Sequence, residues 1–373
     1  MEAKHSIFLF LFCLFVTPLS AQRARDFGIS FGVMETGDKN AITDVSGLSV
    51  GHQTIIKGEH IRTGATAIIP HSGNIFQSKV PAAIYIGNGF GKLAGYSQVE
   101  ELGLLETPII LTNTLSVGTA ITATIRHTIS QDENNGVRSV NAVIGETNDG
   151  YLNDIRGLHV KESDILQAIA NAHTDEVNEG NIGAGTGTIC FGYKGGIGTS
   201  SRKLPSSLGG YTVGILVQTN FGGTLKISGV PIGQKLGKYS FSSALESADG
   251  SCIIVVATDA PLDARNLKRL AKRALLGLGR TGGIASNGSG DYVVAFSTAV
   301  KNRVSYKAEK VQAFEYLNND QTSPLFLAAI EATEEAIINS LFAAESMTGH
   351  RGNIQALPKE KVLELLRTYQ AID

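Results

Sequence analysis

The segment Ser286-Asn287-Gly288-Ser289-Gly290-Asp291 places one serine between two glycines, directly before the apolar run 292–296. A serine hydroxyl is a weak nucleophile unless a base lies beside it. If the bond between Gly288 and Ser289 is cut, the new α-amine of Ser289, with an ordinary pKa of about 7.7–8.0, supplies that base. The glycines allow the strained backbone that attack of the Ser289 hydroxyl on the Gly288 carbonyl requires. The segment therefore indicates a self-cutting N-terminal serine nucleophile, with an ordinary glycine-rich turn as the alternative.

Three further motifs match known patterns less well. Ser49 lies in a GxSxG sequence at 47–51, but a strand-like run follows it where a serine hydrolase needs a helix. The glycine-rich runs 87–92 and 183–188 resemble phosphate-binding loops, yet both lack the GK[ST] ending. We interpret all three as turns.

Polar side chains follow two of the apolar runs. Glu146 and Asn148 come after the run 140–144, and Asn220 comes after the run 211–217. Ligands of α/β proteins collect at such strand ends. Glu146 could hold a substrate ammonium group, and the Asn220 amide could donate to an oxyanion, a contact worth about 2.7–4 kcal/mol in acyl transfer. Self-capping turns are the alternative in both places.

The N-terminus predicts export. An apolar block at 6–17 follows Lys4 and His5 and ends at the small pair Ser20-Ala21, as in a secretory signal peptide. We expect residues 1–21 to be removed, leaving a mature chain 22–373 that is periplasmic or secreted and not bound to a membrane. The alternative is a single N-terminal anchor.

Composition excludes several classes of function. The net charge is −2 without blocks of like charge, so neither nucleic acid nor an anionic membrane is an expected partner. The eight histidines and three cysteines show no metal-binding spacing, and we expect neither a metal nor a cofactor. Cys190 and Cys252 lie in apolar runs, which favours two buried thiols over a disulfide.

The apolar runs predict a layered α/β fold. Most are apolar on both faces, as in strands covered on both sides; they span 65–69, 82–86, 109–111, 140–144, 211–217, 252–257 and 292–296. Helical spacing predicts one helix from Pro261 to Gly279 and another from Pro324 onward. We expect one domain over 22–373, with 236–250 as a surface insertion.

Seven stretches, in a fixed order between residues 40 and 358, resemble the β-peptidyl aminopeptidase family, which includes the L-aminopeptidase D-Ala-esterase/amidase enzymes. They are 40–45, 88–92, 113–118, 145–150, 195–202, 257–262 and 286–291. The resemblance implies a four-layer αββα sandwich, similar to the N-terminal-nucleophile hydrolases but differently connected. It also implies self-cleavage into fragments 22–288 and 289–373, assembly of these αβ units into a homo-oligomer, and a small peptide or amino-acid amide as substrate.

The resemblance also assigns roles. Ser289 matches the nucleophile and first residue of the second fragment, Glu146 the carboxylate that holds the substrate amine, and Asn220 the oxyanion donor. Thr333 and Glu335 match a hydroxyl and a carboxylate that assist the nucleophile.

Two positions depart from simple expectation. Asn148 stands where some family members carry tyrosine. In a regular helix Thr333 shares the apolar face with Ile330 and Ile337, so its hydroxyl should be buried, whereas Glu335 points away from it.

The sequence thus predicts a self-processing serine aminopeptidase or amidase that acts on peptides, amides or esters with a free amine. A conventional exported serine hydrolase using Ser49 without self-cleavage is one alternative, and a non-catalytic peptide-binding or amino-acid-binding protein is another. The choice among α-peptides, β-peptides and D-amino-acid amides or esters depends on the width of the pocket.

Overall fold

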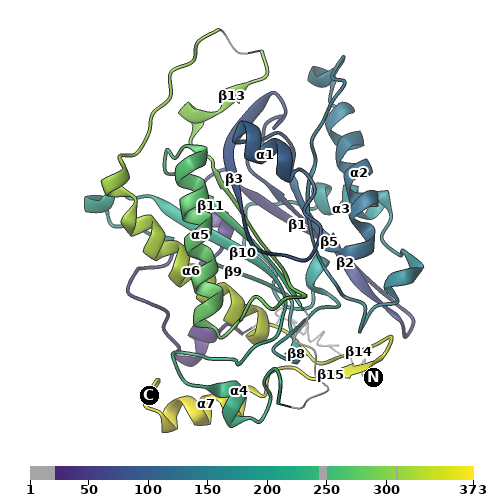
Figure 1. Ribbon diagram of the computed structural model, residues 1–373, viewed down its shortest axis with the longest axis vertical. Coiled ribbons are helices and arrows are strands. Elements are labelled where there is room, and N and C mark those ends of the chain that lie inside the picture. The colour runs from purple at the N-terminus through teal and green to yellow at the C-terminus, as the bar shows by residue number, and fades with distance from the viewer. Residues whose placement is uncertain (1–21, 243–249, 308–309) are drawn as a thin grey trace, which may run out of the picture.

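The computed structural model of the protein describes residues 22–242, 250–307 and 310–373. The expected signal peptide, 1–21, lies outside these residues. The described chain forms two β-sheets packed face to face, with a pair of helices on the outer side of each (Figure 1). The four-layer αββα arrangement expected from the sequence is confirmed.

The smaller sheet has the strand order β1-β2-β5-β6. Its strands are β1 (Ser49–Lys57), β2 (Ile61–Ile69), β5 (Ile109–Asn113) and β6 (Val143–Thr147). β5 and β6 are parallel, so both end at the same edge of the sheet. Helices α2 (Val117–Ile129) and α3 (Glu162–Ala170) cover its outer face.

The larger sheet has the order β13-β3-β12-β11-β10-β9, with β4 paired to β3. Its strands are β3 (Ser78–Gly89), β4 (Leu104–Leu105), β9 (Ile197–Lys203), β10 (Thr212–Asn220), β11 (Ser251–Thr258), β12 (Gly290–Ser297) and β13 (Val304–Ser305). Helices α5 (Ala264–Arg280) and α6 (Ser323–Phe342) cover its outer face.

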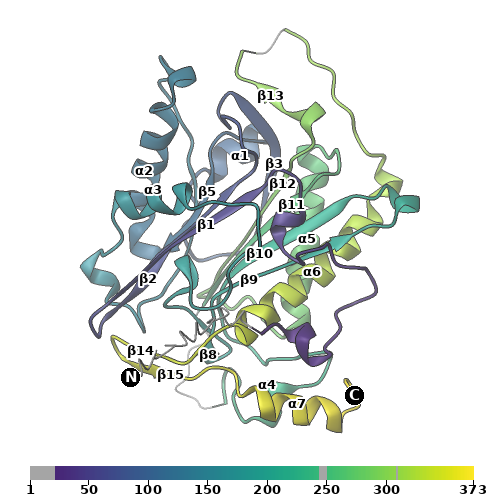
Figure 2. The same cartoon turned by 180° about the vertical axis from the view of Figure 1, so that it is seen from behind.

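Smaller elements complete the described chain. They are α1 (Tyr96–Leu102), α4 (Ile232–Lys235), α7 (Lys359–Thr368) and the two-stranded pairs β7 (Ile189–Cys190) with β8 (Tyr193–Lys194) and β14 (Met347–Gly349) with β15 (Gly352–Ile354). In both opposite views, α4, α7, β14 and β15 lie at one end of the molecule (Figure 2).

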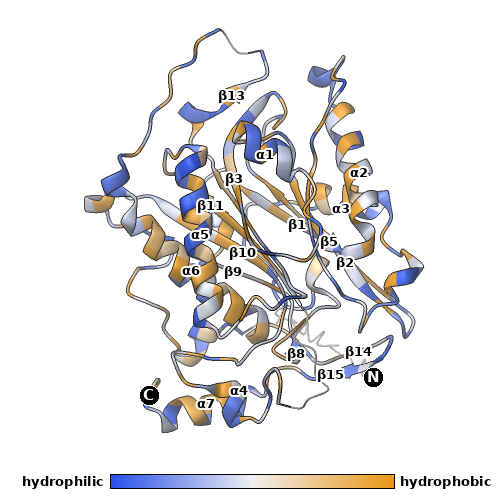
Figure 3. Cartoon of the chain, viewed as in Figure 1, coloured by the Kyte–Doolittle hydropathy of each residue, from blue (hydrophilic) through white to orange (hydrophobic). Residues whose placement is uncertain are grey.

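Three hydrophobic clusters fill the spaces between the layers. On β12, Val294 and Phe296 pack between the two sheets, whereas Val293 and Ala295 pack under α5 and α6. A third cluster joins the smaller sheet to α2 and α3. Several central strands are therefore apolar on both faces, as the mostly hydrophobic colouring of β10 and β11 shows (Figure 3). Most predicted runs lie in observed strands or within one residue of them, but the run 140–144 overlaps β6 only at 143–144, because β6 starts at Val143.

One predicted helix differs at both ends, because α5 starts later than Pro261 and continues past Gly279 to Arg280. α5 begins at Ala264, three residues after Pro261, because the Asp263 side chain accepts the Asn266 amide and caps the helix there. α6 spans Ser323–Phe342 with a proline in its first turn, as expected.

The competing motifs are structural. Ser49 is the first residue of β1, so no helix follows it. Residues Gly183–Gly185 form a 3₁₀ turn against β2, where a Cβ on Gly183 would lie 2.4 Å from Thr66 Oγ1. Cys190 and Cys252 are buried and unpaired, which agrees with the expectation of two thiols. None of the described helices combines the length and apolarity needed to cross a membrane.

Candidate active site

Four strands of the larger sheet meet at the edge where the candidate residues gather. The register pairs Asn220 at the end of β10 with Ser251, Ser251 with Gly290 at the start of β12, and Gly290 with Gly89 at the end of β3. In the smaller sheet, parallel β5 and β6 end nearby, and β6 carries Glu146.

A cavity of about 840 Å³ opens between these strand ends. Glu146, Asn148, Asn220 and Gly288 all line it. Residues 238–240, part of the expected surface insertion, also line it, so that segment is a cavity wall; 243–249 lie outside the described residues.

The cavity lining carries more positive than negative side chains. The described lining residues include one carboxylate, Glu146, and four cations: Lys92, Arg156, Lys238 and Arg351. A substrate ammonium group therefore has a single anionic partner in this part of the chain. No three His, Cys, Asp or Glu side chains of the described residues are grouped so that they could hold a metal ion.

Glu146 is held rigidly at 3 % exposure. Its Oε1 accepts the Lys92 backbone N–H at 2.9 Å, and its Oε2 accepts the Thr114 hydroxyl. Gly91 allows this approach, because a Cβ there would lie 3.1 Å from Glu146 Oε1. A carboxylate oxygen has lone pairs for more than one donor, so Glu146 can also accept an ammonium group.

Asn220 is oriented by its carbonyl. Its Oδ1 accepts the Ile189 N–H at 3.0 Å, and within the described chain no acceptor is recorded for its NH₂ group. The NH₂ group is thus available as a donor in the cavity. Asn148 is exposed and its Oδ1 accepts the Gly150 N–H at 2.9 Å, which is the self-capping turn considered above.

Ser289 stands at the head of β12 with 1 % exposure, and its hydroxyl has no hydrogen-bond partner. Its N–H donates to the Ser286 carbonyl at 2.9 Å, and its carbonyl accepts the Phe90 N–H at 3.2 Å. Gly288 lines the cavity beside it. The bond between the two residues therefore lies at the cavity wall.

Asn88 is a site residue that the sequence did not reveal. Its Nδ2 donates to the carbonyls of Ser286, Asn287 and Ser289, so one amide clamps the loop around Gly288. Asn88 lies in the run 87–92, which was interpreted as a turn, but residues 87–89 are the end of β3, so the interpretation was wrong for that part. Its partners are about two hundred residues further along, and no local pattern marks such a contact.

Asp291 is a second residue that was overlooked. Its side chain is 1 % exposed and neither carboxylate oxygen has a hydrogen-bond partner. Burial raises the pKa of Asp291 to about 6, against the opposing effects of the Ser289 hydroxyl and the Cys252 backbone. The register shifts at this position because Gly87 of β3 is a bulge between the partners of Asp291 and Tyr292, and bulges often accompany active sites.

Thr333 and Glu335 are not among the residues that line the cavity. The Thr333 hydroxyl donates to the Ala329 carbonyl at 2.7 Å, and the residue packs against Gly277 of α5. It is buried, as its place on the apolar face predicted.

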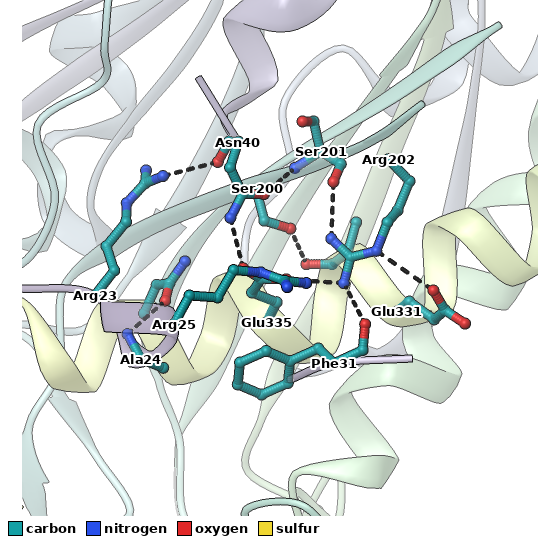
Figure 4. A network of polar contacts seen from close by, with 12 residues as sticks. Arg23, Ala24, Arg25, Phe31, Asn40, Ser200, Ser201, Arg202, Glu331 and Glu335 are labelled. Carbon is teal, nitrogen blue, oxygen red and sulfur yellow. Dashed lines mark hydrogen bonds and ion pairs between the residues drawn. The ribbon is translucent and has the colours of Figure 1, made fainter. Parts of the chain in front are cut away.

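Glu335 is also fully buried, because the N-terminal segment covers that side of α6. Arg25 Nε lies 2.6 Å from its Oε1, Arg202 Nη2 lies 2.8 Å from its Oε2, and Asn40 donates to it as well (Figure 4). Burial raises the pKa of Glu335, but Arg25 and Arg202 outweigh this effect and hold it below its usual range.

The structure therefore does not bring Glu335 to Ser289. The register places Arg202, its partner, level with Ser297, the last residue of β12. Ser297 is eight residues from Ser289, which is about 26 Å at ~3.3 Å per residue.

Comparisons with known proteins give a consistent result. The model of peptidase family S58 matches residues 40–355. The β-peptidyl aminopeptidase BapA of Sphingosinicella microcystinivorans is 42 % identical, over 94 % of this chain and 93 % of its own length. These similarities confirm the resemblance found in the sequence.

Solved structures agree. A protein of Pyrococcus horikoshii is 47 % identical with a TM-score of 0.87, over 94 % of this chain and 99 % of its own. The L-aminopeptidase D-Ala-esterase/amidase of Ochrobactrum anthropi, described as a prototype serine aminopeptidase with a variant of the N-terminal-nucleophile hydrolase fold, is 40 % identical with a TM-score of 0.87 over the same shares. The expected fold is confirmed.

Proposed function

The chain belongs to peptidase family S58 and is an aminopeptidase or amidase, and on that premise we propose that it matures by cutting itself between Gly288 and Ser289. The observation that carries this proposal is the position of Ser289. Its unpaired hydroxyl stands at the head of β12, with Gly288 at the wall of a cavity that also contains Glu146 and Asn220.

The intact chain supports cleavage as a required step. Ser289 is 1 % exposed and its hydroxyl oxygen is buried, so a substrate in the cavity does not reach the hydroxyl while Gly288 is attached. Cutting removes the Gly288 carbonyl from the Ser289 nitrogen and frees the first residue of the new fragment 289–373. It also turns an amide nitrogen, which is not basic, into an amine that is.

The cavity supports a mechanism for the mature enzyme. Glu146 binds the free ammonium group of the substrate through a charge-assisted hydrogen bond. The Ser289 hydroxyl attacks the carbonyl of the N-terminal residue while its own α-amine takes the proton. The Asn220 NH₂ group donates to the developing oxyanion. Water then attacks the acyl ester and releases the amino acid.

The remaining assignments stay proposals of the same kind. The apolar N-terminal block supports export to the periplasm or medium, and the family resemblance supports a homo-oligomer of αβ units acting on small peptides or amino-acid amides. Assistance by Thr333 and Glu335 stays a prediction; the ion pairs of Glu335 favour a part in holding the N-terminal segment.

A denaturing gel with N-terminal sequencing tests self-cleavage. We expect two fragments, the second starting at Ser289, and a single uncut, inactive chain for Ser289→Ala. Ser49→Ala is the matched control, since it removes the competing nucleophile, and it should cut and work normally. A wild-type preparation that stays whole yet hydrolyses amino-acid p-nitroanilides refutes the mechanism, and a Ser49→Ala variant that is inactive favours the conventional hydrolase.

A further inference from the structure

Asp291 is a buried carboxylate without partners. Both of its oxygens are buried and unpaired among the residues of the structure. Buried polar groups are almost always hydrogen-bonded, and buried carboxylates are usually paired with a cation or neutralised. An exception of this kind needs an explanation, and the strand it occupies supplies one.

The Ser289 hydroxyl lies close to the Asp291 carboxylate. Side chains alternate along β12: Val293 and Ala295 pack under the helices, whereas Tyr292 and Val294 face the other sheet. Asp291 has the parity of the first pair, and Ser289 lies two residues before it, in the turn that leads into β12, so the two Cα atoms are at most about 7 Å apart. The Ser289 hydroxyl and the Cys252 backbone both lower the pKa of the Asp291 carboxyl, and the hydroxyl has no other hydrogen-bond partner in the described chain.

The intact chain needs a base that the mature enzyme does not. Before cleavage the Ser289 nitrogen is an amide, so it takes no proton from the hydroxyl. Glu146 is already held by donors across the cavity. Of the groups beside Asp291, the Cys252 thiol of β11 has a pKa raised well above its usual range by burial, and Tyr292 faces the other sheet. The Asp291 carboxylate is the remaining acceptor.

We propose that Asp291 is the catalytic base, and then the acid, of self-cleavage between Gly288 and Ser289. This inference rests on the proposed function. Asp291 takes the proton from the Ser289 hydroxyl while Ser289 Oγ bonds to the Gly288 carbonyl carbon. The carbon–nitrogen bond then breaks, and Asp291 returns the proton to the leaving nitrogen, which becomes the α-amine. Water hydrolyses the resulting ester, which releases the Gly288 carboxylate and restores the hydroxyl.

The environment of Asp291 suits both halves of this step. Burial raises the pKa of Asp291 to about 6, so the group is mostly ionised at neutral pH and is still a far better acid than water. A general base works best when its pKa is near the working pH. Once the chain is cut, the α-amine takes over and Asp291 has no further proton to move.

The test is a cleavage time course on full-length chain, followed on denaturing gels from synthesis onward. Asp291→Asn keeps the shape and removes the base, and we expect cleavage at least about 100-fold slower, as for loss of a general base. Asp259→Asn is the matched control: Asp259 is a partly buried carboxylate after β11 whose Oδ1 accepts the Thr212 N–H. It should cut at the wild-type rate.

Each outcome separates the two proposals. If the wild type does not cut at Ser289, the proposed function fails. If the wild type and a folded Asp291→Asn variant cut at equal rates, the role of Asp291 fails and the proposed function stands.

The pH profile keeps the inference testable if Asp291→Asn does not fold. Wild-type cleavage should rise with pH and level off above about 6, and Asp291→Glu should keep measurable cleavage with a shifted midpoint. A wild-type rate that does not change between pH 4.5 and 7.5 overturns the proposal, since a carboxylate that only supports structure leaves no such midpoint.

Discussion

Two buried carboxylates of the larger sheet and its covering helices have opposite surroundings. Glu335 receives two arginines and an asparagine. Asp291 is just as inaccessible, but no cation of the described chain is paired with it, and only the Ser289 hydroxyl and the Cys252 backbone oppose the effect of burial. The pKa of Glu335 is lowered and that of Asp291 is raised. Burial alone does not decide what a carboxylate does; its partners do.

The contrast separates structural from reactive groups. A fully paired buried carboxylate fixes the segments that supply its partners, here the N-terminal segment and β9 against α6. An unpaired one lowers the stability of the fold whenever it is ionised, so its presence beside a nucleophile is better explained by chemistry.

The largest effect is expected where a paired charge loses its partner. Arg202→Leu leaves Glu331 and Glu335 buried with one cation fewer, and removing one member of a buried pair typically lowers the free energy of unfolding by about 3–5 kcal/mol. Denaturant unfolding measures this change. Lys203→Leu, at the exposed neighbouring position, is the control. An equal change in both variants would mean that the buried network adds no stability.

Removing the unpaired charge of Asp291 should instead stabilise the protein. The pKa of Asp291 rises from 3.8 to about 6 on folding, so the folded state is penalised by up to about 3 kcal/mol at neutral pH. Asp291→Asn should remove most of that penalty. Both chains are compared in the uncut Ser289→Ala background, so that processing does not differ.

The raised pKa of Asp291 also fixes the direction in which the stability of the protein changes with pH. The folded state binds the Asp291 proton more tightly, so the parent loses stability as pH rises from about 4 to 6, and the gain from Asp291→Asn should vanish below pH 4. A variant that is less stable than its parent at pH 7.5 contradicts the picture of an unpaired carboxylate.

In the number of its partners, Glu146 is intermediate between Glu335 and Asp291. It accepts hydrogen bonds from two protein donors and lines the cavity. Glu146→Gln removes the charge proposed to hold the substrate amine, and we expect kcat/KM to fall about 10-fold to 150-fold, the equivalent of about 1.5–3 kcal/mol for a charged hydrogen bond. Asn148→Ala, at the exposed cavity rim, is the control and should change it much less. Equal losses would argue against amine recognition by Glu146.

The smallest effect is expected for an exposed pair. Lys301 and Glu315 are 2.6 Å apart, with 73 % and 60 % of their side chains exposed. Surface pairs of this kind contribute about 0–1 kcal/mol, so Lys301→Ala should change the free energy of unfolding by less than about 0.5 kcal/mol. A change as large as that of Arg202→Leu would show that burial is not the deciding factor.

Much of the fold was accessible from the sequence, because strands covered on both faces leave continuous apolar runs such as 252–257 and 292–296. The cavity groups Glu146 and Asn220 were found because polar residues at strand ends stand out against those runs. Asp291 was not singled out, since its lack of partners is a property of three dimensions. The same holds for Glu335, whose partners Arg25 and Arg202 lie 310 and 133 residues away.

The central position of β12 in the larger sheet has a consequence for refolding of the protein after cleavage. β12 is hydrogen-bonded to β3 on one side and β11 on the other, so a cut before its first residue leaves a new chain end in the middle of a sheet shared by two polypeptides. Folding of the precursor is unimolecular, but refolding after the cut is a second-order reaction that slows on dilution. The proposed cleavage would therefore make recovery from complete denaturation depend on concentration, while the assembled sheet would hold both pieces in place.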